Sequence, residues 1–361
     1  MTMRRFLSGF VIGTLMAVIA LELGLRLLPV NSGLRMAPTS DAMPISRYLA
    51  QQPYVYSLGW ALANPMKGET NRLGFTRSAD EVRPGGVLVI GDSYIEAQML
   101  EYRDTLQGRL DAALPGRAMA ASASGNGLAD ALRIIEAFAP VHRPAAVVVL
   151  VEPTDLSGLL DAPSAGHNGF VLRAGEVAVV HQPYTESRLK TLLTKSALVR
   201  YVYYNLKFPG WWARLRLQPA HPADSADGSA AATTEAATGH DGRRQALAWF
   251  MARLRTLADA GGFKVLFLID GDRRALYADR PDPTAQWDRA DRQALLGLAA
   301  AQGHQVIDLD PVFAAHWRKR QERLDWSPHD WHWNAVAHDL AAQTVLERLP
   351  AAQATTIDTP R

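Results

Sequence analysis

Short, uninterrupted apolar runs recur along the chain and alternate with stretches of helical periodicity. Strands that are apolar on both faces are typical of a parallel sheet covered by helices on both sides. The predicted strands are residues 87–90, 118–123, 145–151, 264–270 and 304–310. The predicted helices are residues 105–114, 128–139, 243–260, 288–302 and 334–349. This alternation predicts one α/β domain over residues 86–350.

The alternation is interrupted between residues 160 and 242, which we interpret as an insertion in the domain. Residues 170–180 alternate about a central glycine and predict a hairpin. Residues 187–206 have helical spacing and an aromatic cluster. Residues 219–242 are of low complexity and are expected to be disordered.

Two further segments flank the domain. Residues 31–85 are rich in Pro, Asn, Ser and Gly and show little periodicity, so they are predicted to be an extracytoplasmic lead-in that crosses the domain surface. Residues 351–361 form a short tail. No internal repeat is detected in the sequence.

Residues 1–30 have the pattern of a membrane anchor. Two arginines precede an apolar run over residues 6–21, and the run can span a bilayer if Glu22 and Arg26 lie near the far interface. Positive residues before the run favour a cytoplasmic N-terminus, so we expect a single-pass inner-membrane protein with a periplasmic catalytic domain. A cleaved signal peptide and a buried soluble helix remain alternatives.

Composition narrows the classes of function. The 361 residues are 48% hydrophobic and 20% charged, enough for a full core, and the formal net charge is +2. No basic run marks a nucleic-acid partner, so none is expected. The absence of cysteine excludes disulfides, a thiolate nucleophile and cysteine-based metal sites. No cofactor is predicted.

A candidate nucleophile, Ser93, follows the first predicted strand in Gly91-Asp92-Ser93. Ligands of open α/β sheets bind beyond the carboxyl ends of strands, where helix N-termini offer unpaired N–H groups. A serine there can expose its hydroxyl and offer its own backbone N–H to an oxyanion. Alternatively, Asp92 or Ser93 only caps the next helix.

The base and its orienting carboxylate are predicted near the other end of the chain, in SPHDWHWNAVAH. Asp330 and His332 are two residues apart, so in an extended turn both side chains emerge on the same side. The carboxylate can then hold one imidazole nitrogen while the other faces the serine. A structural loop is one alternative. A metal site is another, formed by His329, Asp330, His332 and His338.

Gly125 lies in ASASGNGLAD, where another strand should end. Because it has no Cβ, a backbone N–H there can approach a substrate oxygen. A glycine that only shapes a turn is the alternative.

In this order, GDSYIEA, SGNG, the strand ending in PTD, and DWHWNAVAH resemble the sequence blocks of SGNH (GDSL-like) hydrolases. The resemblance covers residues 86–349, apart from the insertion. It implies a flavodoxin-like three-layer sandwich with a parallel sheet. It also implies that Ser93 is the nucleophile, His332 the base and Asp330 its orienter, with an oxyanion hole from the N–H groups of Ser93 and Gly125.

The chain departs from the family pattern at two points. The family usually has an asparagine where this chain has Thr154, so the third oxyanion donor is either Thr154 or, by proximity, Asn126. Asp330 and His332 enclose one residue rather than the usual two. This D-x-H-W arrangement resembles that of membrane-associated SGNH proteins that O-acetylate or deacetylate exported polysaccharides.

We therefore expect a membrane-anchored serine esterase that acts on ester groups, O-acetyl above all, of a glycan or another cell-envelope substrate. A polysaccharide O-acetyltransferase and a catalytically degenerate glycan-binding assembly protein are the alternatives. The sequence identifies no protein partner. Five tryptophans are candidates for stacking on sugar rings, for core positions or for the membrane interface: Trp211, Trp212, Trp326, Trp331 and Trp333.

Overall fold

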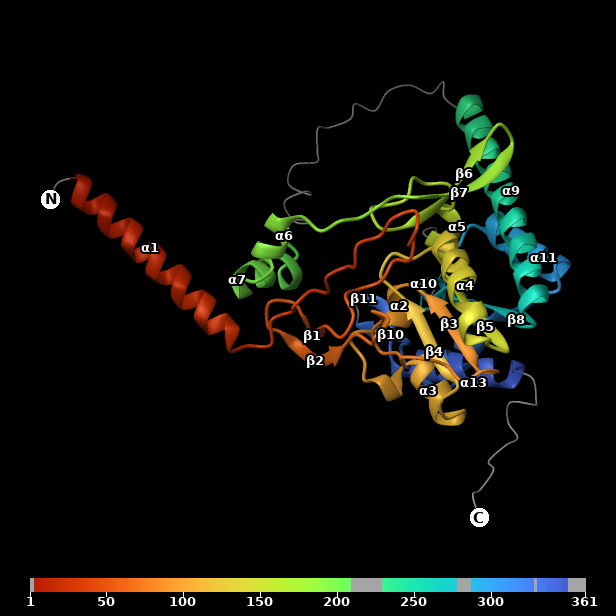
Figure 1. Ribbon diagram of the computed structural model, residues 1–361, viewed down its shortest axis with the longest axis horizontal. Helices are drawn as coiled ribbons and strands as arrows, with labels where there is room; N and C mark the ends of the chain where they lie inside the picture. The colour runs from red at the N-terminus through yellow and green to blue at the C-terminus, as the bar shows by residue number, and fades with distance from the viewer. Residues whose placement is uncertain (1–2, 209–228, 278–286, 328–329, 350–361) are drawn as a thin grey trace, which may run out of the picture. The chain divides into compact units, whose positions relative to one another are not determined.

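The computed structural model describes residues 3–208, 229–277, 287–327 and 330–349 (Figure 1). The chain forms two compact units. The N-terminal unit comprises Met1–Arg35, Gln52–Glu69 and Glu186–Asp224. The sheet unit comprises Met36–Gln51, Thr70–Thr185 and Ser225–Arg361.

A five-stranded parallel sheet forms the centre of the sheet unit, with the strand order β4-β3-β5-β8-β9. This is the 2-1-3-4-5 order of flavodoxin-like folds, so the predicted fold class is confirmed. Almost every sheet residue of β3, β4 and β5 is fully buried, which explains their uninterrupted apolar sequences. The strands are β3 (Val87–Gly91), β4 (Ala118–Ser122), β5 (Ala146–Val151), β8 (Lys264–Ile269) and β9 (Gln305–Asp308).

Helices cover both faces of the sheet, as its alternating side chains require (Figure 1). Leu88 and Ile90 point into the core layer formed with α4, α9 and α11. Val87 and Val89 point into the opposite layer, formed with α3 and α13. These helices are α3 (Leu106–Ala113), α4 (Leu128–His142), α9 (Ser229–Gly261), α11 (Arg289–Ala301) and α13 (Ala335–Arg348).

Several short elements escaped the sequence analysis because their apolar patterns are too brief to identify. In the sheet unit they are α2 (Ser93–Glu96), η1 (Tyr102–Asp104), α5 (Pro153–Ser157), α10 (Arg273–Tyr277), α12 (Asp310–Arg320), β10 (Asp325–Ser327) and β11 (Asp330–Trp333). In the N-terminal unit they are the antiparallel strands β1 (Pro53–Leu58) and β2 (Ala63–Glu69), which lie in the predicted lead-in.

The predicted insertion, residues 160–242, is divided between the two units: some of its elements belong to the sheet unit and others to the N-terminal unit. Its hairpin is present as β6 (Asn168–Arg173) and β7 (Glu176–His181). Residues 187–206, expected as one helix, form α6 (Arg188–Leu193), α7 (Ala197–Arg200) and the π-helical turn η2 (Tyr201–Asn205). The helix is broken because Ser196 caps a new one, accepting a hydrogen bond from Val199 N. Of the low-complexity stretch, residues 219–228 lie outside the described residues, and α9 is helical from Ser229.

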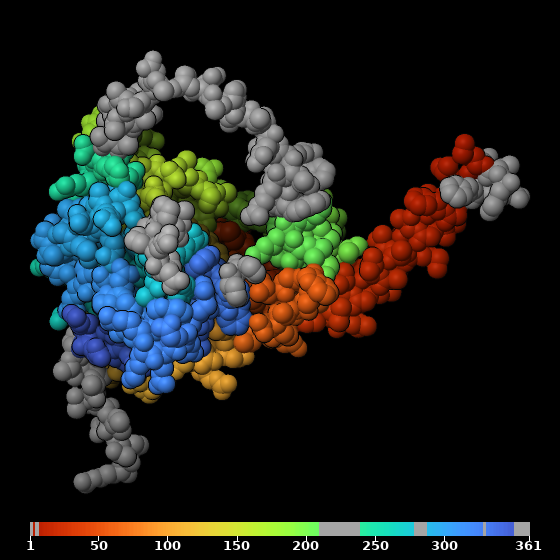
Figure 2. All heavy atoms as spheres, turned by 180° about the vertical axis from the view of Figure 1, so that it is seen from behind, coloured from red at the N-terminus to blue at the C-terminus, as the bar shows by residue number. Residues whose placement is uncertain are grey.

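Helix α1 (Met3–Arg26) is long and apolar enough over Leu7–Arg26 to cross a membrane. Its side chains are exposed along its length (red in Figure 2). A signal sequence has the same length and composition, so the helix alone does not distinguish an anchor from one.

A buried ion-pair cluster ties the C-terminal hairpin β10–β11 to the sheet. Arg273, fully buried, donates to Asp270 Oδ2 (3.1 Å), just beyond β8, and to Asp325 Oδ1 (2.9 Å) in β10. The indole of Trp333, in β11, donates to Asp270 Oδ1 at 2.8 Å. Burial raises the pKa of Asp270 to about 6 despite the nearby guanidinium. Asp325 also accepts from Arg323 Nη2, at 3.1 Å. The hairpin therefore depends on buried charges that require one another as partners.

We expect Arg273→Met to destabilise the protein by roughly 3–5 kcal/mol, because buried Asp270 loses its cation and buried Asp325 keeps only its pair with Arg323. The midpoint of thermal unfolding measures this effect. The control is Arg255→Met, which removes the exposed Arg255–Asp259 pair and should leave the midpoint nearly unchanged. Equal midpoints for the two variants would contradict the role assigned to Arg273.

Candidate active site

Ser93 lies at the carboxyl end of β3, as the first residue of α2. The close approach of Gly91 to its neighbours positions this turn: a Cβ at Gly91 would lie 2.5 Å from Ile95 Cγ1. Asp92 caps the helix, since its Oδ1 accepts a hydrogen bond from Tyr94 N at 3.0 Å. The capping role therefore belongs to Asp92, and the Ser93 hydroxyl is left for other contacts. As the first residue of α2, Ser93 has a backbone N–H without an intrahelical acceptor.

Strand β11 carries Asp330 and His332 to Ser93. His332 Nε2 lies 2.8 Å from Ser93 Oγ. His332 Nδ1 lies 2.5 Å from Asp330 Oδ1, and the same oxygen accepts from His332 N at 3.1 Å. The structure thus joins the three residues of the predicted triad in one hydrogen-bonded chain. Such a chain can accept the proton of the serine hydroxyl and return it to a leaving group.

The imidazole is held by its neighbours as well as by the carboxylate. The ring of Tyr94 lies 4.9 Å from that of His332, and Arg273 donates to the Tyr94 hydroxyl at 3.3 Å. Tyr94 also makes an edge contact with Trp333, at 5.8 Å between centroids. Trp333 is fully buried, so it belongs to the core rather than to a sugar-stacking surface.

Burial and nearby charges shift the pKa values of His332 and Asp92, the two titratable groups beside Ser93. Burial alone would lower the pKa of His332, but the hydrogen bond and charge of Asp330 outweigh it, helped by Asp92 and Glu152. The pKa of His332 therefore lies above its usual value. Burial, followed by the charge of Glu152, raises the pKa of Asp92 to about 7. Asp92 Oδ2 lies 3.4 Å from Ser93 Oγ, so a second titrating group borders the nucleophile.

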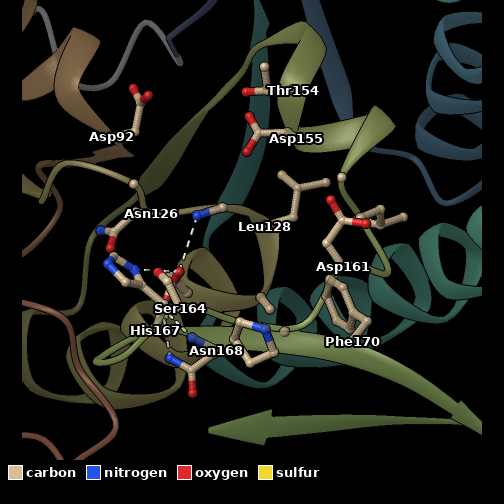
Figure 3. Close-up of a pocket in the computed structure, with 18 of the residues that line it drawn as sticks. Asp92, Asn126, Leu128, Thr154, Asp155, Asp161, Ser164, His167, Asn168 and Phe170 are labelled. Atoms are coloured by element: carbon tan, nitrogen blue, oxygen red, sulfur yellow. Dashed lines mark hydrogen bonds and ion pairs between the residues drawn. The ribbon is translucent and has the colours of Figure 1, made fainter. Parts of the chain in front are cut away.

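Gly125, Asn126 and Thr154, the candidates for oxyanion contacts, line one cavity of about 290 Å³ together with Asp92 (Figure 3). This volume is at the lower end of the range for small-molecule sites, about 300–1,000 Å³. Gly125 adopts φ +84°, a conformation that favours glycine, so the residue type is required by the backbone of the turn. The cavity therefore brings Gly125, Asn126 and Thr154 into one space beside the Asp92-Ser93 turn.

The two candidates for the third donor differ in what their side chains already bind. The exposed Thr154 donates its hydroxyl proton to Glu152 Oε1, so in this arrangement the proton is not directed at a substrate oxygen. Asn126 is 6% exposed, and its Nδ2 makes only a long contact of 3.4 Å with Gly91 O. Its Oδ1 is buried and lacks a hydrogen-bond partner among the described residues. Asn126 therefore retains donor capacity on this side of the cavity.

Two carboxylates that the sequence analysis missed, buried Asp130 and half-buried Asp155, hold the cavity loops. Asp130 accepts from Gly127 N (3.1 Å) and from Asn168 N (2.9 Å), and it lies 3.3 Å from His167 Nδ1. It thus joins the SGNG turn to the start of β6. Asp155 accepts from Glu152 N at 2.9 Å, and burial holds its pKa well above the usual value. The only sequence signal was a carboxylate three residues inside a helix, as in a capping box.

Glu96, in α2, holds the segment that leads into Gly125. It is 1% exposed, and its Oε2 accepts a hydrogen bond from Ser124 Oγ. Its Oε1 accepts from Gln98 Nε2 at 2.5 Å. The hydroxyl of Tyr48 lies 3.4 Å from Ser124 N and is hydrogen-bonded to Glu96. Burial raises the pKa of Glu96. The Glu96 carboxylate therefore connects α2, which begins at Ser93, to the turn at Gly125.

The described residues of the alternative metal site, Asp330, His332 and His338, are not grouped as metal ligands. His338 is fully buried, and its Nδ1 accepts from Leu106 N at 3.0 Å. Burial, then the charge of Arg109, lowers its pKa to about 3. His329 lies outside the described residues, as do Trp211 and Trp212. Elsewhere in the described residues, one group has ligand atoms within 4.8 Å of one another: His240, Asp288 and Asp291.

One carboxylate of that histidine–aspartate group is already paired with a cation of the protein. Arg243 Nε lies 2.9 Å from Asp291 Oδ2, and Arg243 Nη2 lies 2.8 Å from His240 Nδ1. Asp288 accepts from Ala290 N and caps α11. These contacts explain the cluster as a helix cap with an ion pair.

No protein-family model and no curated protein matches the chain. Several solved structures are similar to it, at low identity. An alpha/beta hydrolase enzyme from the metagenome of Lake Arreo, Spain, is 10% identical, with 76% of this chain and 98% of that chain covered and a TM-score of 0.41. The acetyl xylan esterase AlAXEase is 13% identical, with 73% and 100% covered and a TM-score of 0.41.

A catalytic mutant of an acetylxylan esterase from Geobacillus stearothermophilus is also 13% identical, with 76% of this chain and 98% of that chain covered and a TM-score of 0.39. Similarities of this size do not carry the assignment. The fold class rests on the strand order of the sheet, and the site rests on the hydrogen bonds among its side chains.

The raised pKa of His332 predicts a pH profile. A base must be neutral, so activity should fall as the pH drops through this pKa. Asp330→Asn removes the charge that raises it and should move the acidic limb of kcat/KM to lower pH. The plateau should also fall by about 10⁴, because the imidazole loses its oriented tautomer. Rates with an activated acetyl ester measure both effects. Asp161→Asn, at an exposed carboxylate of the cavity, is the control and should change neither.

We expect Glu96→Gln to lower kcat with little change in KM. The carboxylate oxygen that accepts from the Ser124 hydroxyl is replaced by an amide, which has one acceptor oxygen and one NH2 donor. The turn at Gly125 then loses its fixed position. Since oxyanion contacts form in the transition state, the loss should appear in kcat, and it should stay below the roughly 10²–10³ of a deleted donor. Gln98→Ala removes a different partner of Glu96 and is the control. A parental kcat in Glu96→Gln would show that other contacts hold the turn.

Proposed function

We propose that this chain is an SGNH-type serine esterase that removes acyl groups, O-acetyl above all, from a glycan or another cell-envelope substrate. The observation that carries the proposal is the continuous hydrogen-bonded chain from Ser93 through His332 to Asp330. A capping serine or a structural loop has no need of such a chain. The small cavity beside the Asp92-Ser93 turn suits a short acyl group.

In the proposed reaction, Ser93 Oγ attacks the ester carbonyl while His332 Nε2 takes its proton. Asp330 holds Nδ1–H and stabilises the imidazolium. The N–H groups of Ser93 and Gly125, with Asn126 as the third donor in preference to Thr154, would bind the oxyanion. The tetrahedral intermediate collapses as His332 returns the proton to the departing alkoxide, leaving an acyl-serine. Water, activated by the same imidazole, then releases the acid and restores Ser93.

Transfer to a sugar hydroxyl is the second candidate, and it shares every step up to the acyl-serine. The D-x-H-W arrangement around Asp330 and His332 is the reason to consider it, because that arrangement resembles both the membrane-associated SGNH proteins that O-acetylate exported polysaccharides and those that deacetylate them. A sugar hydroxyl would replace water as the acceptor. The third alternative, a degenerate glycan-binding protein, is disfavoured because the triad side chains are joined by hydrogen bonds.

We also propose that α1 anchors the protein in the inner membrane, with the rest of the chain in the periplasm. The apolar span over Leu7–Arg26 and the two arginines that precede it support this orientation. An exported glycan would then meet the enzyme on the periplasmic side. The predicted domains, an anchor over residues 1–30 and a catalytic domain over 86–350, belong to the same proposal.

A fluorophosphonate probe should label the parent protein at Ser93, and Ser93→Ala should abolish labelling. The control, Ser164→Ala, changes an exposed serine of the same cavity and should retain it. Acetate release from an activated acetyl ester should fall in parallel with labelling. Undiminished labelling of Ser93→Ala would refute the proposed nucleophile. Adding an oligosaccharide acceptor distinguishes the two candidates, because a transferase acetylates it whereas an esterase only releases acetate.

A further inference from the structure

Large apolar side chains are exposed in the N-terminal unit far more than in the sheet unit. In the described part of the larger sheet unit, Met43 and Val141 are the exposed large apolar residues. In the N-terminal unit, apart from α1, exposed large apolar residues include Leu27, Leu28, Trp60, Leu189, Leu192, Leu193, Tyr203 and Leu206. Such a concentration marks a surface that is covered by something else.

Helix α6 presents a distinct apolar face. Leu189, Leu192 and Leu193 have the i, i+3, i+4 spacing of one helix face and are 65%, 64% and 45% exposed. Arg188 and Lys195, at its two ends, are exposed cations. An apolar face bordered by basic residues is the pattern of helices that lie in a membrane interface, where anionic lipid headgroups attract the cations.

Hydrogen bonds fasten this segment to the end of α1. Glu22 accepts from Ser196 Oγ (2.7 Å), Ala197 N (3.1 Å) and Leu198 N (2.9 Å), so its carboxylate caps α7. Arg26 pairs with Glu22 at 2.7 Å. Figure 2 shows the surface of residues 187–208, in green, adjoining the C-terminal end of α1. The segment is thus held at one point along the helix.

If α1 spans a bilayer, the attachment at Glu22 lies at a definite depth in it. Fifteen residue steps separate Leu7 from Glu22, about 22 Å at a rise of about 1.5 Å per residue. The hydrocarbon core is about 30 Å thick, so Glu22 lies at or inside its far boundary. A carboxylate there requires partners, and α7 provides them. Leu193 lies three residues before Ser196, within about 10 Å of chain. The face of α6 must therefore lie close to the lipid.

We propose that residues 188–206 form a second membrane contact, lying in the outer-leaflet interface with the leucines of α6 against acyl chains and the basic side chains among anionic headgroups. This inference rests on the proposed anchor. A bilayer fits the surface better than a protein partner, because the surface is continuous with the spanning helix and its depth is set by Glu22. The N-terminal unit would then be bound to the membrane by more than one helix.

The cysteine-free chain allows a direct test with single probes. Leu192→Cys, Val141→Cys and Leu15→Cys would each carry an environment-sensitive fluorophore in the full-length protein. The proteins are placed in nanodiscs that contain phosphatidylglycerol and lipids with quenchers on the acyl chains. Val141, 72% exposed in the sheet unit, is the matched control, and Leu15 reports on α1. We expect lipid quenching at Leu192 to be at least threefold that at Val141.

The three positions separate failure of this inference from failure of the anchor. Quenching at Leu15 but not at Leu192 would overturn the second contact and leave the anchor intact. A Leu192 probe that is shielded from aqueous iodide yet unquenched by lipid would indicate a protein partner and would also overturn it. Absence of quenching at Leu15 would refute the anchor and, with it, this inference.

A second variant tests the role of Glu22. Combined with the Leu192 probe, Glu22→Ala removes the acceptor of Ala197 N and Leu198 N at the start of α7. It should lower lipid quenching at residue 192 at least twofold, while the Leu15 probe stays quenched. The control is Glu69→Ala, which changes an exposed carboxylate at the end of β2 in the same unit and leaves the Glu22 contacts in place. Equal quenching at residue 192 in the two variants would contradict the positioning by Glu22.

Discussion

The buried guanidinium of Arg273 is the contact on which the candidate site depends. The hairpin that carries Asp330 and His332 has two short strands, too few for independent stability. Arg273 binds Asp325 in that hairpin and Asp270 at the end of β8, and Asp270 in turn holds the indole of Trp333. A charged cluster of this kind specifies one geometry, because each buried member costs free energy unless all partners are present. The position of His332 beside Ser93 follows from that constraint.

Buried carboxylates also hold the structure around Ser93, the proposed nucleophile. Asp92 caps the helix that begins with Ser93, while Glu96 at the other end of that helix holds the segment before Gly125. Asp130 joins the next turn to β6. These carboxylates are placed where backbone N–H groups and hydroxyls need acceptors, so they hold loops that have little apolar surface of their own. Precise loops at the end of a rigid sheet are what oxyanion stabilisation requires.

In the N-terminal unit, Glu22, near the end of the apolar helix α1, likewise accepts hydrogen bonds from a distant segment. Its carboxylate binds the N-terminus of α7, so one acidic residue joins an apolar helix to a segment 174 positions later. The proposed interfacial position of that segment and the proposed esterase are independent in their chemistry. Both depend on an acidic side chain whose partners come from distant parts of the chain, and neither set of partners is visible in local sequence.

The sequence by itself determined the central strands and the helices that cover them, and it pointed to the residues proposed here as a triad. The strands were recognisable because a parallel sheet buries both faces, and the triad because GDS and DxH stand beside strand and helix signals. Only the tertiary structure showed that Thr154 donates to Glu152, that Trp333 is core, and that residues 187–206 break at Ser196. Periodicity reports which face of an element is buried. Arg273 binds Asp325 over 52 residues, Glu96 binds Ser124 over 28, and Glu22 binds Leu198 over 176. Such pairings arise only when the chain has folded.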